Sequence, residues 1–114
     1  MTPLEISRLC SLGEFNHIKQ YFSENIVWEI IGEQELPNLD AVLKHCTQIE
    51  TYFNSVQHEF SIEREYQDQN TCIIQGRALF FTAEQTTRIS ACDIYTFDGS
   101  YKIERIQSYC IKTQ

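Results

Sequence analysis

The stretch RISACDIYTFDGSYKIERIQSYCIK, residues 88–112, decides the fold. Two long runs of alternating apolar and polar residues flank Asp98-Gly99, and Asp-Gly between such runs is among the strongest short-range signals for a β-hairpin. In the first run Asp93, Tyr95 and Phe97 share one face, because successive side chains of a strand point to opposite faces. If that face is buried, a carboxylate in line with two aromatic rings is either paired or functional.

The chain before this hairpin begins with helical signals. Thr2 is a suitable cap, Pro3 suits the first helical position, and Glu5 completes a capping box. Gly13 is placed to end this helix in a left-handed turn, and a second short helix follows. We then expect a strand over residues 25–31, a polar loop over 32–38, a helix over 39–53 capped by Asn38, and strands over 54–66, 71–82, 88–97 and 101–112.

Helices grouped before a run of strands predict an α+β domain, with the helices on one face of an antiparallel sheet. Strands of ten or more residues normally curl. We therefore expect a curved antiparallel sheet wrapped round helices to form a cone-shaped barrel with an apolar interior, made by residues 1–114 as a single domain.

Composition narrows the classes of partner. A net charge of −7 and a pI near 4.8 argue against nucleic acid and against anionic membrane surfaces. No apolar run approaches the ~20 residues of a membrane helix, and no secretory signal is visible, so we expect a cytoplasmic protein. The five cysteines and three histidines show neither disulfide nor metal-ligand spacing, and phosphate-binding glycine loops are absent. No metal and no cofactor are expected.

Three segments together resemble the nuclear transport factor 2-like superfamily, and within it the SnoaL-like polyketide cyclases and the relatives of ketosteroid isomerase. They are LGEFNHIKQYFSENIVWEIIG at 12–32, LPNLDAVLKHC at 36–46 and CDIYTFDGSYKIERIQSY at 92–109. The resemblance implies a cystatin-like, conical α+β pocket for a small hydrophobic molecule, often in a homodimer built on the outer surface of the sheet.

Only part of the isomerase active site has matching residues in this sequence. Asp93 falls where isomerase-like members place an acid that donates to the substrate oxyanion, and SnoaL-like cyclases are similar in using one acid on a late strand. The helix-1 tyrosine of the isomerases would fall near Ile6, and their general-base aspartate near Ile30. Since neither isoleucine can donate or accept a proton, steroid-type isomerisation is not expected.

Asp93 and His58 are the candidate catalytic residues. A two-residue turn at Asp98-Gly99 would place Asp93 opposite Glu104, whereas a three-residue turn would place it opposite Arg105. We prefer the second register, which also aligns Tyr95 with Ile103 and makes a structural ion pair plausible.

His58 shares a face with apolar neighbours, where a core histidine is commoner than a catalyst, although together with Asp93 it would form an acid–base pair. The expected ligand-binding residues are Trp28, Ile30, Phe60, Tyr95, Phe97 and Tyr109.

Three hypotheses follow. The first is a cofactor-free isomerase, cyclase, lyase or hydrolase that acts on a small hydrophobic molecule through Asp93. The second is a non-catalytic, dimeric module that binds a ligand or a protein. The third is a dimeric scaffold whose cone is filled by side chains. They differ in whether Asp93 faces an open cavity or pairs with Arg105 or Arg77.

Overall fold

The structure is a computed structural model and describes residues 1–113. Its helices are α1 (Pro3–Ser11), α2 (Phe15–Ile18), the 3₁₀ helix η1 (Lys19–Tyr21) and α3 (Leu39–Ser55). Its strands are β1 (Phe22–Ile30), β2 (Gln34–Leu36), β3 (Gln57–Asp68), β4 (Thr71–Phe81), β5 (Thr86–Phe97) and β6 (Ile103–Thr113). The predicted α+β class is confirmed.

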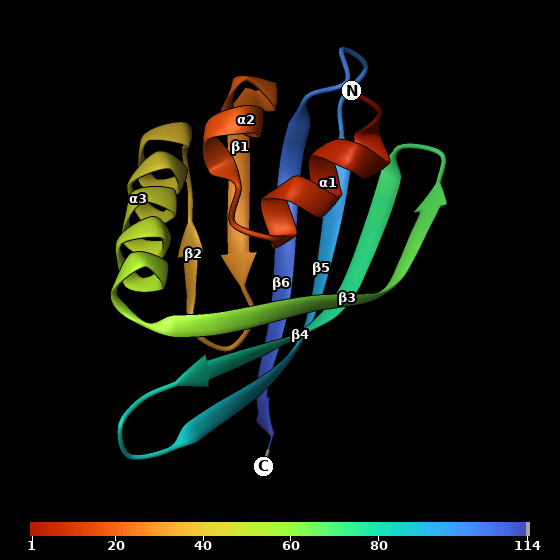
Figure 1. Cartoon of the computed structure of the whole chain (residues 1–114). Coiled ribbons are helices and arrows are strands. Elements are labelled where there is room, and N and C mark those ends of the chain that lie inside the picture. Colours follow the sequence, from red (N-terminus) through yellow and green to blue (C-terminus); the bar gives the residue numbers. More distant parts are fainter. Residues whose placement is uncertain (114) are drawn as a thin grey trace.

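The strands form one sheet in the order β2-β1-β6-β5-β4-β3, and α1, α2 and α3 lie over a single face of it (Figure 1). All neighbouring strands are antiparallel except β1 and β6, which run parallel. The sheet is therefore mixed, whereas we had expected every pair of strands to be antiparallel. Because β2 and β3 are edge strands, the curved sheet forms an open cone and does not close into a barrel.

Both long helices begin as their sequences predict. Thr2 accepts a hydrogen bond from the backbone of Glu5, and the side chain of Glu5 accepts one from the backbone of Thr2. The side chain of Asn38 accepts a hydrogen bond from the Ala41 amide at 2.9 Å at the start of α3. These caps satisfy backbone donors that would otherwise lack partners.

The first strand and the loop after it differ from our prediction. β1 begins at Phe22 and not at residue 25, and the expected loop over 32–38 contains the short strand β2. Leu36 pairs with Trp28 across the antiparallel turn, and its side chain is buried. The single apolar residue of that polar stretch is thus drawn into the core, where its burial stabilises a strand too short to show alternation.

The register of the final hairpin was also predicted wrongly. Asp93 lies opposite Ser108, and neither Glu104 nor Arg105 faces it; Tyr95 lies opposite Ile106. A bulge between Thr96 and Phe97 adds to the shift.

The loop of this hairpin is longer than either turn that we considered. The Asp98 amide donates to the Lys102 carbonyl at 2.8 Å, and the Asp98 carboxylate accepts from the Ser100 and Lys102 amides. The left-handed residue of this loop is Tyr101, with φ of 60°, and Gly99 does not have a positive φ. The aspartate side chain therefore organises a wider loop than the Asp-Gly pair suggests.

The hydrophobic core lies between the helices and the concave face of the sheet. Tyr95 and Phe97 are its largest fully buried side chains, and Ile18 and Ile26 are completely inaccessible. This core is continuous across all layers and holds α1 and α3 over the sheet, which places their inner faces around the cavity described below.

Two glycines with positive φ give a stability test. Gly13 has φ of +79° and Gly32 has φ of +81°. An alanine at either position would have to adopt a left-handed backbone conformation, which is unfavourable for residues with a Cβ. A Cβ at Gly13 would also lie 2.7 Å from Cε2 of Phe53, whereas a Cβ at Gly32 would meet nothing within 4 Å. We expect Gly32→Ala to lower the free energy of unfolding by about 1–2 kcal/mol, and Gly13→Ala to lower it further. Urea-induced unfolding measures both, and equal losses would contradict the close packing of Phe53 under the end of α1.

Candidate functional site

A pocket with a cavity volume of about 290 Å³ lies inside the cone. Its walls come from the end of α1, the inner face of α3, and strands β1, β3, β4, β5 and β6. Most of the lining is apolar, and its largest apolar side chains are Phe15, Trp28, Ile49, Phe53, Phe60 and Phe80. Because the cavity is comparable to small ligand sites, the hypothesis of a cone filled by side chains is not supported.

Polar side chains gather at one end of this cavity around Asp93. The Ser11 hydroxyl donates to Oδ2 of Asp93 at 2.8 Å, and the oxygens of Ser11 and Tyr95 lie 2.7 Å apart. Ser108 hydrogen-bonds Asp93 from the neighbouring strand and accepts from Nε1 of Trp28 at 3.0 Å. The result is a connected polar cluster of Trp28, Ser108, Asp93, Ser11 and Tyr95, which we call the Asp93 cluster.

Local structure explains how these groups meet. Asp93 and Ser108 are direct partners in the β5–β6 ladder, so their side chains point to the same face of the sheet. Ser11 is the last residue of α1, and the left-handed turn at Gly13 redirects the chain immediately after it. The end of α1 thus places the Ser11 hydroxyl next to the paired strands β5 and β6.

Burial raises the pKa of Asp93 above its ordinary value of 3.8, and loss of hydration is the largest cause. Hydrogen bonds from Ser108, Ser11 and Tyr95 act in the opposite direction and offset part of the shift. Among residues 1–113 no basic side chain forms a salt bridge with Asp93. A carboxyl group in this setting holds its proton to a higher pH than an exposed aspartate does.

The two arginines considered as partners of Asp93 are occupied elsewhere. Arg105 donates to Glu29 at 3.1 Å, and Arg77 donates to Glu63 at the same distance. The structural ion pair that competed with the functional hypothesis is therefore not formed.

Burial also raises the pKa of Tyr95 well above its usual range, and the nearby Asp93 adds to this effect. The pKa of the Cys10 thiol is raised for the same main reason. Both groups stay protonated at neutral pH. Tyr95 is consequently a hydrogen-bond donor beside Asp93 and not a second anion.

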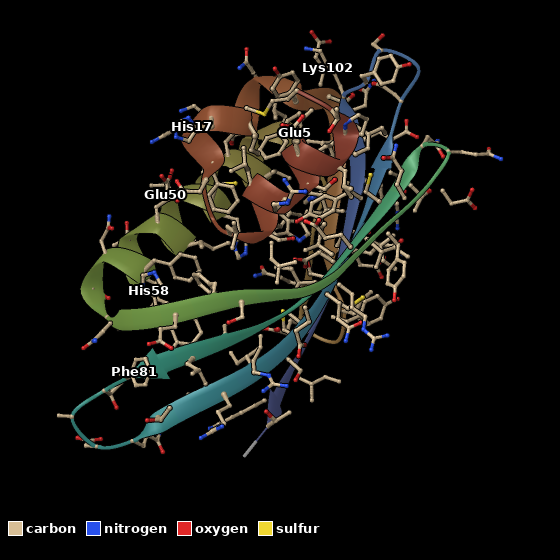
Figure 2. All side chains as sticks on the ribbon, turned by 45° about the vertical axis from the view of Figure 1, so that its right-hand side comes forward. Glu5, His17, Glu50, His58, Phe81 and Lys102 are labelled. Atoms are coloured by element: carbon tan, nitrogen blue, oxygen red, sulfur yellow. The ribbon has the colours of Figure 1, made fainter. Side chains whose placement is uncertain are left out.

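His58 does not join Asp93. Its Nδ1 lies 3.0 Å from the Val56 carbonyl oxygen, and its ring packs against Phe53, Phe60 and Phe80. His58 lies at the start of β3 next to the end of α3 (Figure 2), and it is not among the residues that line the cavity. The geometry is that of a histidine held in an aromatic cluster.

The predicted ligand-binding residues divide into two groups. Trp28, Ile30, Phe60 and Tyr95 line the cavity. Phe97 is fully buried in the core, away from the cavity, and Tyr109 is exposed on the outer face of the sheet. Tyr109 lies outside because it follows Ser108, which points inward.

Sequence reasoning missed Ser11, His45 and Ser108. His45 lies on the apolar stripe of α3, three residues after Val42 and four before Ile49, so its helical spacing was a usable signal. Ser108 lies two residues after Ile106 on the inward face of β6, and its position was visible in the alternation. The role of Ser11 depends on the tertiary docking of α1, which no local pattern shows.

Residues 1–113 contain no group of three or more histidine, cysteine or acidic side chains that would hold a metal ion. In the same range no helix has both the length and the apolar character that crossing a bilayer requires.

Comparison with solved structures identifies the family. The chain is similar to an NTF2-like protein of unknown function from Cytophaga hutchinsonii, with a TM-score of 0.86 and 30% sequence identity over 94% of each chain. The chain therefore belongs to the NTF2-like superfamily, as the sequence resemblance had suggested. No family model matches the sequence, and no curated protein matches it.

Two further solved structures share the fold at low identity. One is an LEH-like epoxide hydrolase from M. tuberculosis, with a TM-score of 0.71 and 12% identity over 96% of this chain and 82% of the other. The second is a SnoaL-like polyketide cyclase from Jannaschia sp. CCS1, with a TM-score of 0.76 and 10% identity over 95% and 84%. At this identity they establish the shared architecture alone.

The raised pKa of Asp93 predicts a specific pH dependence of stability. Between the ordinary value of 3.8 and the folded pKa, the folded state binds more protons than the unfolded state. The unfolding free energy of the wild type should therefore fall, relative to Asp93→Asn, as pH rises through this window, and the difference should be constant below it. Urea unfolding at a series of pH values measures this effect.

Carboxyl NMR titration of the same proteins supplies the control. Ser108→Ala removes a hydrogen bond that lowers the pKa, so the pKa of Asp93 should rise further in this variant. A folded Asp93 that titrates at or below 3.8 would contradict the burial of an unpaired carboxyl group.

Proposed function

We propose that this protein binds a small, mostly apolar molecule with an oxygen function in the conical cavity, and that Asp93 transfers a proton to or from it. The observation that carries the proposal is one carboxyl group with a raised pKa, without a cation, at the polar end of an otherwise apolar cavity. Perturbed carboxyl groups in clefts are typical of acid–base sites.

The arrangement of donors favours a carbonyl or ether oxygen as the group that Asp93 contacts. A protonated carboxyl donates one hydrogen bond, and Tyr95 and Ser11 place two hydroxyls next to it. Negative charge that develops on a substrate oxygen would find donors already oriented in surroundings of low polarity, where hydrogen bonds to charge are strong. The aromatic wall of Phe53, Phe60 and Phe80 would take the apolar body of the molecule.

The reaction class that fits is proton transfer at a hydrophobic carbonyl compound, as in an isomerisation or an intramolecular cyclisation. The cavity supplies a carboxyl group that can donate or accept a proton, neighbouring hydroxyl donors and an apolar wall. All five cysteines are unpaired, which is consistent with the reducing cytoplasm that we propose as its location.

Exchange of the α-hydrogens of 1-tetralone in D₂O tests this function. This small bicyclic ketone has a single enolisable carbon, and deuterium uptake is followed by proton NMR. We expect the protein to accelerate exchange over free acetate and imidazole at equal concentration, and Asp93→Asn to lose about 10²-fold of that rate.

Asp40→Asn is the matched control, because Asp40 is an exposed acid on α3 that pairs only with Lys44 at the helix surface. This variant should keep the full rate. A wild-type protein that exchanges 1-tetralone no faster than buffer would reject the proposal for carbonyl substrates.

A second candidate function, a dimeric binding module, is favoured by the outer face of the sheet. The side chains of Ile73, Ile94, Tyr109 and Ile111 point to this face from three adjacent strands, and Tyr109 and Ile111 are exposed. We propose that a second copy of the chain covers this apolar strip. Dimerisation is compatible with either function of the cavity, which opens on the opposite face.

Light scattering at micromolar concentration tests the dimer. We expect twice the chain mass for the wild type and a monomer for Tyr109→Arg, because a buried unpaired charge at an interface is costly. Tyr101→Arg is the control, since Tyr101 is exposed on the β5–β6 loop away from the strip. A monomeric wild type would contradict the assembly.

A further inference from the structure

His45 is a titratable group in the cavity wall that the proposed function has not used. It lies on α3, lines the cavity, and contacts Trp28 in an edge-to-face arrangement with ring centroids 5.1 Å apart and an interplanar angle of 90°. Trp28 in turn donates to Ser108, which hydrogen-bonds Asp93. One indole ring therefore separates His45 from the Asp93 cluster.

The imidazole of His45 is incompletely satisfied. Its Nδ1 is buried and has no hydrogen-bond partner among residues 1–113. The large majority of buried polar side-chain atoms in folded proteins have such a partner, and an exception calls for a functional or structural reason. A histidine retained on an apolar helix face, where leucine would pack without penalty, is consistent with a role toward a ligand.

The ionisation of His45 suits a proton acceptor. Burial lowers its pKa, although the nearby side chain of Gln48 and the negative charge of Glu33 oppose the shift. The titratable groups that face this region are Glu33 from the β1–β2 turn, Cys110 from β6 and Asp93 beyond Trp28. The imidazole is neutral at neutral pH and keeps a lone pair.

We propose that His45 is a second catalytic residue of this cavity, the base that removes a proton from the substrate carbon while Asp93 donates a proton to the substrate oxygen. This inference rests on the proposed function and identifies the partner of Asp93. His45 on α3 and Asp93 on β5 both line this cavity, so one small molecule bound in it would have the imidazole and the carboxyl group in its walls.

The proposed proton transfers involve only the ketone, His45 and Asp93, and need no further reactant. The α C–H bond breaks and its proton goes to the imidazole, while the electron pair forms the carbon–carbon double bond. The carbonyl π pair takes the proton of Asp93 to give the enol, which leaves imidazolium and carboxylate. In D₂O the imidazolium exchanges its proton with solvent, and the reverse reaction returns deuterium to carbon.

The test is 1-tetralone exchange with His45→Gln, compared with His17→Gln. His17 is exposed on α2, at the outer side of the helical layer (Figure 2). We expect His45→Gln to lose about 10²-fold of the exchange rate with less than about a twofold change in the concentration for half-saturation, and His17→Gln to keep the wild-type rate.

Two readouts separate a base from a structural residue. Added imidazole should restore exchange to His45→Ala in proportion to its concentration. In the wild type the rate should fall as pH drops through a pKa below 6.5, and His45→Gln should lose this dependence.

The outcomes distinguish the two proposals. Full exchange by His45→Gln together with loss in Asp93→Asn would overturn the role of His45 and leave the proposed function intact. No exchange by the wild type would overturn both. Loss in His45→Gln without rescue by imidazole in His45→Ala would show a packing role and also reject His45 as the base.

Discussion

The structure depends on how one carboxyl group is accommodated inside an apolar cone. Asp93 lies on a central strand whose inward neighbours are hydrophobic, and no arginine or lysine in residues 1–113 neutralises it. An unpaired carboxylate in such a place is costly. Hydroxyls from Ser11 and Ser108 lower this cost, and burial raises the pKa of Asp93, so that the group keeps its proton to a higher pH than an exposed aspartate does.

This requirement connects elements that are far apart in the chain. Ser11 reaches Asp93 only because α1 ends there and turns at Gly13, and the Arg8–Glu65 ion pair ties the same helix to β3. Ser108 reaches Asp93 only in the observed register of β5 and β6. Helix packing and strand register therefore set the chemistry of the cavity, because displacing either one by a single residue would remove one of the hydroxyl donors of the carboxyl group.

The sequence predicted the fold well because its signals are local. Alternation, caps and turn residues each act over a few positions, and they gave the helices, the long strands and the α+β class. The register of β5 and β6 was not predictable in the same way. It depends on Asp98 organising a wide loop and on a bulge at Thr96, which are choices among turns of similar energy. The observed register places Asp93 opposite Ser108 and not opposite Arg105, which removes the structural ion pair that competed with its predicted catalytic role.

The same distinction explains why His58 was favoured from sequence and His45 was overlooked. Both histidines lie on apolar faces, but β3 places His58 among aromatic rings, whereas α3 places His45 against Trp28 at the cavity. In a cone, every strand and helix presents residues to one shared interior, so a catalytic role is tied to a position in space and not to a position in the chain. Ile30 cannot accept a proton, yet it borders the same cavity as His45. A base supplied from α3 would therefore face the same bound substrate as one supplied from β1, and the absence of a base at Ile30 does not by itself argue against catalysis in this cavity.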